Sequence, residues 1–171
     1  MELPNRKRNR LENGDYSAGS YFITICVSDR KRLLGTIVGT GVPDCPKPTL
    51  YKCGRLAEKY ILQLNEFYEN ISVDKYVIMP DHIHLLISIY NGQSGTPVPT
   101  MDNSCFNNSN SAVAKFVSTF KRFFNKEYGE NIWQSRYYDH IIRNKQDYEE
   151  IWNYIDNNPI SWILKNETRD E

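Results

Sequence analysis

Apolar and polar residues alternate along several short stretches of the chain, which is the pattern of β-strands that are buried on one face. Residues 20–28 show this alternation and are predicted to be a strand, and we also predict strands at residues 33–38, 48–51, 73–79, 82–90 and 132–142. Pro80 and Asp81 interrupt the pattern between the fourth and the fifth stretch, so these two form either an antiparallel pair or one bulged strand.

A second pattern, in which apolar residues recur every three or four positions, predicts helices. It covers residues 53–69 and 111–128. A last helix begins after Asn144, a residue type that caps helix N-termini well, and we expect it to end at about Asn157, before Pro159.

The order of these elements predicts the fold. Apart from the short hairpin formed by the second and third strands, the order is strand, helix, strand, strand, helix, strand, which is the split-βαβ or ferredoxin-like arrangement. We therefore predict an α+β protein with a central antiparallel sheet, helices on one face, and an additional C-terminal helix. The 171 residues fit a single domain, 1–171, with a basic arm at 1–19, a mobile loop at 91–110 and a polar tail at 163–171.

Positive charge is gathered in clusters, although the chain has a formal net charge of zero from 21 Lys and Arg against 21 Asp and Glu. A nucleic-acid-binding protein is often basic overall, so only the distribution of charge can support such a function here. Arg8 lies in the N-terminal arm, Lys121 and Arg122 in a second cluster, and Arg143 in a third. These four are candidate phosphate contacts, and ordinary solvated positions are the alternative.

The cysteines give no sign of a disulfide framework or a zinc finger. Their positions, Cys26, Cys45, Cys53 and Cys105, include no C-x-x-C pair. No apolar segment follows the Arg-rich N-terminus, and no apolar run is long enough to span a membrane. We therefore expect free thiols and a cytoplasmic location.

Two of the three histidines lie one residue apart within a strongly apolar predicted strand. Successive strand residues point to opposite faces, so His82 and His84 share a face, and neighbours on one face are about 6.5–7 Å apart at Cα. Two imidazoles at this spacing can converge on a metal ion, which then needs a third protein ligand from another element. Two hydrogen-bonded structural histidines are the alternative, although burying unpaired imidazoles is costly. His140 can orient a ligand or can be purely structural.

The predicted C-terminal helix offers both a further ligand and a nucleophile. Tyr154 and Asn158 are four positions apart and lie on the same side of the helix. A phenol and a carboxamide in this arrangement can contact one metal-bound phosphate together, and a tyrosine hydroxyl can act as a covalent nucleophile, although packing is the commoner role of a tyrosine. Tyr137 and Tyr138 are rival nucleophiles, but in a strand they have no partner equivalent to Asn158.

Three separated motifs resemble one known family. The segment MPDHIHLL resembles the His-hydrophobic-His motif of the single-tyrosine HUH transposases. The segments WQSRYYDHIIRN (133–144) and YIDNNPISW (154–162) resemble the C-terminal signature of the branch that includes the REP-associated tyrosine transposases. The N-terminal RNRLENGDYS, followed by YFITICVSDR, is similar to that branch as well, so the resemblance covers nearly the whole chain.

The resemblance implies a ferredoxin-like HUH domain that acts as a DNA transposase and single-stranded DNA endonuclease. It implies Tyr154 as the nucleophile that forms a 5′-phosphotyrosine link and releases a 3′-OH. It also implies His82 and His84 as ligands of Mg or Mn, with Asn158 at the position where insertion-sequence relatives have a Gln third ligand. The implied substrate is single-stranded DNA that contains a hairpin. Insertion-sequence relatives act as homodimers with exchanged helices and the REP-associated branch as monomers, so both arrangements remain open.

Two other functions would use the same residues differently. A non-catalytic module for single-stranded nucleic acid could bind through the sheet face of a ferredoxin-like fold and would be indifferent to metal. A small metal-dependent hydrolase with another substrate would need the two histidines but not Tyr154. A covalent protein–DNA adduct distinguishes the transposase from both.

Overall fold

The structure is a computed structural model, in which residues 19–37, 46, 48–90 and 112–167 are described. The expected loop at 91–110 and nearly all of the expected basic arm, including Arg8, lie outside the described residues. The elements in chain order are β1 (Gly19–Cys26), η1 (Ser28–Arg30), β2 (Gly35–Thr36), β3 (Thr49–Leu50), α1 (Lys52–Phe67), β4 (Ile71–Ile78), β5 (His82–Ile89), α2 (Ala112–Tyr128), β6 (Tyr138–Ile142) and α3 (Lys145–Glu167). None of the helices in these ranges has the length and apolar character needed to cross a membrane.

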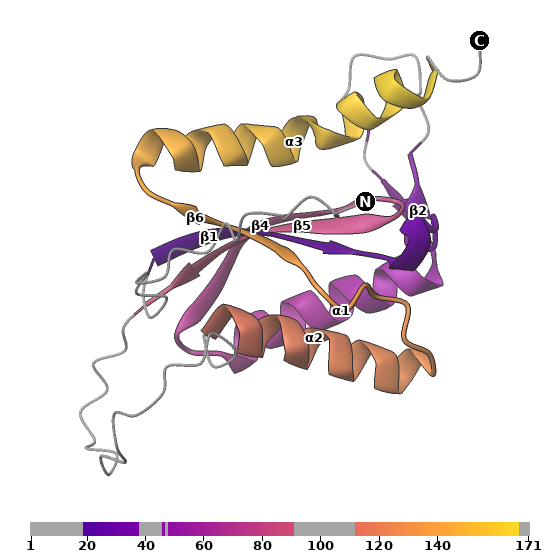
Figure 1. Ribbon diagram of the computed structural model, residues 1–171, viewed down its shortest axis with the longest axis horizontal. Coiled ribbons are helices and arrows are strands. Elements are labelled where there is room, and N and C mark those ends of the chain that lie inside the picture. The colour runs from indigo at the N-terminus through magenta and orange to yellow at the C-terminus, as the bar shows by residue number, and fades with distance from the viewer. Residues whose placement is uncertain (1–18, 38–45, 47, 91–111, 168–171) are drawn as a thin grey trace, which may run out of the picture.

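Four strands form one antiparallel sheet in the order β4-β5-β1-β6 (Figure 1). With β1 and β5 at its centre, the sheet has the ferredoxin-like arrangement, and the predicted α+β fold is confirmed. β4 and β5 are antiparallel neighbours, and the pairing shifts at a bulge between Val73 and Lys75. β2 and β3 pair separately as the predicted short hairpin.

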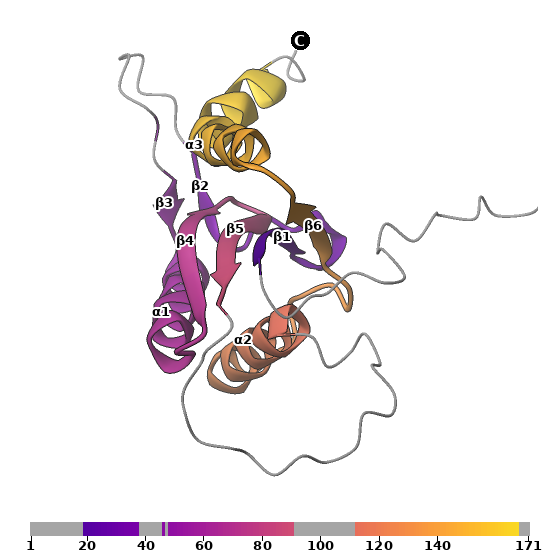
Figure 2. The same cartoon turned by 90° about the vertical axis from the view of Figure 1, so that its left-hand side faces the viewer.

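The sheet separates two apolar layers. α1 and α2 cover one face, and α3 covers the other (Figures 1 and 2). Ile83 of β5 belongs to the larger core, which contains buried residues of the sheet, α1 and α2. Leu86 of β5 points the other way and packs with Ile155 of α3. His82 and His84 share the face of Leu86 because strand residues alternate, so both lie on the α3 side of the sheet.

The last strand is shorter than the predicted strand at 132–142, since β6 begins only at Tyr138. Trp133 makes an isolated antiparallel bridge and is 2% exposed. The carbonyl oxygen of Gln134 accepts a hydrogen bond from the ammonium of Lys121 on α2 at 2.7 Å. The residues before β6 thus reach the core from an irregular segment, and an apolar pattern alone does not separate such a segment from a strand.

The last helix is longer than predicted. Its start is confirmed, because the Asn144 side chain accepts a hydrogen bond from the backbone N–H of Asp147 at 2.9 Å. Its predicted end is wrong, because α3 continues through Pro159 to Glu167, so the expected polar tail at 163–171 is helical up to that residue. A proline removes one backbone hydrogen bond and crowds the preceding turn. Packing of the helix on the sheet offsets that loss here.

Polar contacts also hold α3 on the sheet of its own chain. Tyr148 donates its hydroxyl to the Asp74 carboxylate of β4 at 3.1 Å, and Ser88 of β5 donates to the same carboxylate. Lys75 of β4 forms an ion pair with Asp156 of α3 at 2.6 Å. The position of α3 above the sheet is therefore set by contacts along much of its length.

Candidate active site

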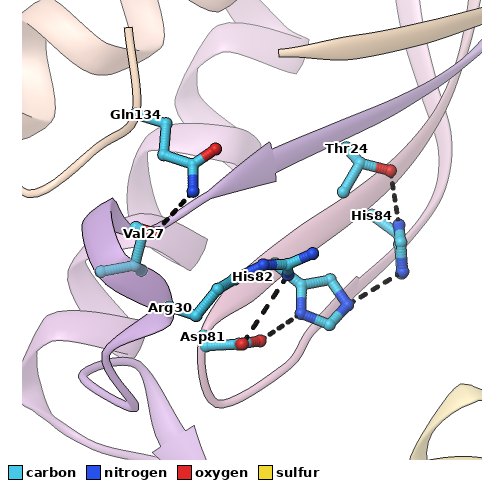
Figure 3. Close-up of polar contacts among 7 residues, drawn as sticks. All are labelled: Thr24, Val27, Arg30, Asp81, His82, His84 and Gln134. Carbon is cyan, nitrogen blue, oxygen red and sulfur yellow. Dashed lines mark hydrogen bonds and ion pairs between the residues drawn. The ribbon is translucent and has the colours of Figure 1, made fainter. Parts of the chain in front are cut away.

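Two imidazoles converge on the α3 side of β5 (Figure 3). His82 and His84 are 8% and 4% exposed. Their Nε2 atoms are 3.0 Å apart and their ring centroids 4.5 Å apart. A separation of one residue within a strand predicts this convergence, because it turns both side chains to the same face.

Each of the two rings has a partner at its other nitrogen (Figure 3). The Nδ1–H of His82 donates to the carboxylate of Asp81, so the Nε2 lone pair of His82 faces the second ring. Nδ1 of His84 lies 2.9 Å from Oγ1 of Thr24, its cross-strand partner on β1. A hydroxyl can donate or accept, so Thr24 holds the ring in either tautomer. Asp81 in turn pairs with Arg30 at 3.7 Å.

The electrostatic environment keeps His84 uncharged. Its pKa is lowered from the ordinary value of 6.5 to about 3, first by burial of the ring and then by the charges of His82 and Arg30. An uncharged imidazole retains a lone pair that can bind a metal ion. At neutral pH, His84 is therefore a nitrogen of the kind that metal sites use.

The donor set of the pair fits a divalent metal. Octahedral Mg²⁺ holds its ligands at about 2.0–2.1 Å, so two donor atoms bound at right angles are about 3.0 Å apart. The Nε2 atoms of His82 and His84 have that separation, which is also the length of the hydrogen bond that joins the two rings. Within the described ranges, no third His, Cys, Asp or Glu completes a group that could hold a metal ion. A carboxamide oxygen is another type of protein ligand that can complete such a site.

α3 passes over the histidine pair with one stripe of side chains. The Tyr154 ring centroid lies 5.3 Å from that of His84, and the Trp162 ring centroid lies 6.0 Å from that of His82. Asn158 is one helical turn from each of these two aromatic residues, on the same side of the helix, and is 8% exposed. The carboxamide is thus buried on the side of α3 that faces the pair.

Tyr154 is far more accessible than its neighbours in the site. It is 49% exposed, and its ring makes edge contacts with the rings of Phe22 at 5.7 Å and His84 at 5.3 Å. A ring that is held on one side and half exposed on the other can be reached by a macromolecular substrate.

Two residues next to the pair have no clear sequence signal. The alternation pattern marks Asp81 only as a break between strands, although a carboxylate beside a histidine is a common partner of a metal-binding ring. Thr24 is 60 positions from His84 and becomes its neighbour only through the register of β1 with β5. A register between distant strands cannot be obtained from spacing along the sequence.

His140 shares the α3 side of the sheet with the histidine pair, because its cross-strand partner is Phe22, and the remaining candidate residues lie on other parts of the fold. His140 of β6 bonds through Nε2 to a carboxylate oxygen of Asp147 at 3.0 Å, which ties β6 to the first turn of α3. Arg143 is exposed in the connection between the same two elements. Lys121 and Arg122 belong to α2, on the opposite side of the sheet from α3 (Figure 2).

The rival tyrosines differ from each other in position. Tyr138 pairs with Thr24 across β6 and β1, so it lies on the face that carries the histidines, and it is 49% exposed. Tyr137 points the other way and packs against the larger core. Tyr138 is therefore the tyrosine against which any role of Tyr154 has to be tested.

Comparison with known sequences identifies a family. The sequence model for IS200-like transposases matches residues 52–158, which extend from the start of α1 to Asn158 and include both histidines. An uncharacterized protein of Haemophilus influenzae is 30% identical to the chain over 170 residues, covering 94% of this chain and 91% of that protein.

Comparison with solved structures identifies the same fold. A REP-associated tyrosine transposase bound to a REP hairpin superposes with a TM-score of 0.61, covering 93% of this chain and 74% of that one. The two sequences are 19% identical, so the similarity concerns the fold.

Proposed function

The chain belongs to the IS200-like transposase family, a family of DNA-cleaving enzymes, and from this premise we propose that it cuts and rejoins single-stranded DNA with Tyr154 as the nucleophile. The observation that carries the proposal is the contact between α3 and β5. The Tyr154 ring lies 5.3 Å from the His84 ring, whose Nε2 faces that of His82 at 3.0 Å. A phenol beside two convergent imidazoles is the arrangement that such an enzyme needs.

We propose that His82, His84 and the Asn158 carboxamide hold a divalent cation, Mg or Mn. When bound, the cation would polarise a phosphate oxygen and offset the negative charge that develops during displacement. The spacing of the two Nε2 atoms supports this assignment, as does the burial of Asn158 on the facing side of α3. Asp81 and Thr24 would serve as positioning residues, because each is bonded to the outer nitrogen of one ring.

In the cutting step, the phenol oxygen of Tyr154 forms a bond to phosphorus, and the bond from phosphorus to the 3′ oxygen of the preceding nucleotide breaks. The phenol proton passes to solvent, and the departing oxygen takes up a proton to become a 3′-OH. The other DNA end stays on the protein as a 5′-phosphotyrosine. Attack of a 3′-OH on this link reverses the step, rejoins the DNA and restores the phenol.

We further propose that the substrate contains a DNA hairpin, because the solved relative with the same fold is bound to a REP hairpin. We also propose that residues 1–171 form a single domain with an active site built within one chain. The anchoring of α3 to its own sheet supports this view, through Tyr148 on Asp74 and through Ile155 in the apolar cluster with Phe22. A homodimer with exchanged helices would have to break these contacts or rebuild them between subunits.

The test is a covalent adduct between the protein and a labelled hairpin oligonucleotide, detected on a denaturing gel in the presence of Mn or Mg. The wild-type protein should form the adduct, Tyr154→Phe should not, and EDTA should prevent it. Tyr138→Phe is the matched control, because Tyr138 has the same 49% exposure and lies on the same face of the sheet. Loss of the adduct in the control, with retention in Tyr154→Phe, would contradict the assignment.

A further inference from the structure

The turn that follows β1 brings positive charge to the edge of the histidine pair. Residues 30–32 are Arg, Lys and Arg. Asp29 and Arg30 both have a left-handed backbone, with φ of 55° and 54°, a conformation that residues with side chains seldom adopt. Two backbone hydrogen bonds hold the turn. The N–H of Val27 donates to the carbonyl oxygen of Asp81 at 2.9 Å, and the N–H of Ser28 donates to the carbonyl oxygen of Ile132 at 2.8 Å. These bonds hold the backbone of the turn in place.

Two arginines of this turn lie near the histidine pair. The Arg30 guanidinium extends from the turn toward Asp81 and His82 (Figure 3), and its side chain is 55% exposed. The guanidinium of Arg32, which is also exposed, lies 5.4 Å from the ring centroid of Trp162. The same indole ring lies 6.0 Å from the ring of His82. Two cations and one aromatic surface therefore border one side of the histidine pair.

We propose that Arg32 and Trp162, with Arg30 at the inner end, form a subsite for the nucleotide next to the bond that is cut. The DNA base stacks on the Trp162 indole, and the flanking phosphates bind the two guanidinium groups. Aromatic rings bind single-stranded bases by stacking, and guanidinium groups bind phosphate through paired hydrogen bonds. This subsite rests on the proposed function, because it is defined by its distance from the bond that Tyr154 attacks.

A second pair with the same chemistry supplies a matched control. Arg122 lies 5.1 Å from the ring centroid of Phe123 on α2, and both residues are exposed. This pair lies across the sheet from α3 and the histidines (Figure 2). If DNA follows the turn after β1, Arg32 contributes to binding and Arg122 does not. If DNA follows α2 instead, the order is reversed.

The experiment measures binding of a fluorescein-labelled single-stranded DNA oligonucleotide by anisotropy in EDTA. All variants carry Tyr154→Phe, so that neither metal nor cleavage contributes. Arg32→Gln should weaken binding and flatten the plot of log K against log salt by about 0.7, the effect of one phosphate contact on single-stranded DNA. Trp162→Ala should weaken binding by about 5- to 150-fold. Arg122→Gln should change neither quantity.

A conservative variant separates a contact with DNA from a fault in folding. Trp162→Phe should keep most of the affinity, because phenylalanine also stacks. It should reduce the quenching of tryptophan fluorescence that we expect DNA to cause in the parent protein, in which Trp133 and Trp152 also fluoresce. Unchanged binding in both Arg32→Gln and Trp162→Ala would overturn the subsite, as would a larger effect of Arg122→Gln.

These outcomes are independent of the adduct assay. If no adduct forms but Arg32→Gln still weakens binding, the contact with DNA stands, whereas the nuclease assignment and the position of the subsite next to a cut bond both fail. If the adduct forms and these variants bind normally, the subsite alone is wrong.

Discussion

Replacing His84 with glutamine should make the protein less sensitive to mild acid. The folded protein holds the pKa of His84 at about 3, against an ordinary value of 6.5. Between these two values the unfolded chain binds a proton that the folded chain excludes, so the free energy of unfolding falls as the pH falls. The contribution of His84 is fully present above about pH 6.5 and is lost progressively below it. Each pH unit in this window is worth about 1.4 kcal/mol, which gives a loss of about 2 kcal/mol at pH 5.

The assay is urea unfolding in EDTA at pH 7 and pH 5, for the wild type and for His84→Gln. Glutamine is uncharged, and its side-chain amide can still bond to the Thr24 hydroxyl. All other titrating groups are the same in both proteins. Acidification from pH 7 to pH 5 should therefore lower the free energy of unfolding of the wild type by about 2 kcal/mol more than that of the variant. His82→Gln should retain most of the acid sensitivity, because burial of His84 is the first cause of its low pKa. Equal losses in the wild type and His84→Gln would refute the reasoning.

Three other substitutions test the site and its support. Asp81→Asn should lower the affinity for Mn by about 10- to 100-fold in calorimetry, because His82 loses a charged partner. Alanine usually stabilises a helix relative to glycine, but Gly54→Ala should destabilise by about 1–3 kcal/mol in thermal unfolding. Its Cβ would lie 2.0 Å from the backbone oxygen of Leu34, and an unchanged or higher Tm would contradict that close approach. Tyr148→Phe should cost about 1 kcal/mol and speed hydrogen exchange in the first turns of α3, where its bond to β4 is lost; unchanged exchange there would mean that the bond does not anchor the helix.

The elements that could be predicted from the sequence are those with one buried and one polar side. The stripe along 53–69 and the alternation of 20–28 leave only one way to bury apolar side chains, and α1 and β1 follow these ranges closely. The same alternation predicts that His82 and His84 share a face. Segments whose apolar residues are buried without regular pairing give no such periodic signal, and this is why the predicted strand at 132–142 began too early.

The sequence did not predict on which side of the sheet each charged residue lies. Lys121 lies in a basic cluster, but its ammonium is partly buried and bonded to the carbonyl oxygen of Gln134, and burial lowers its pKa. Arg30 and Arg32 follow a strand in a short run that resembles an ordinary solvated turn. Only the left-handed backbone of the turn and the length of α3 bring them to the histidines.

The continuation of α3 beyond Pro159 determines how much of the proposed site one helix can carry. A helix that ended before Pro159 would leave Asn158 at a frayed end and Trp162 without a fixed position. Since the helix continues, Tyr154, Asn158 and Trp162 recur at steps of about 6 Å along one side. Together they span about 12 Å, which exceeds the distance of about 6.5–7 Å between two same-face strand residues. The proposed nucleophile Tyr154, metal ligand Asn158 and base-stacking residue Trp162 then belong to one continuous helix and move together. Any change that loosens α3 from its sheet should therefore reduce DNA cutting, metal binding and the binding of single-stranded DNA together.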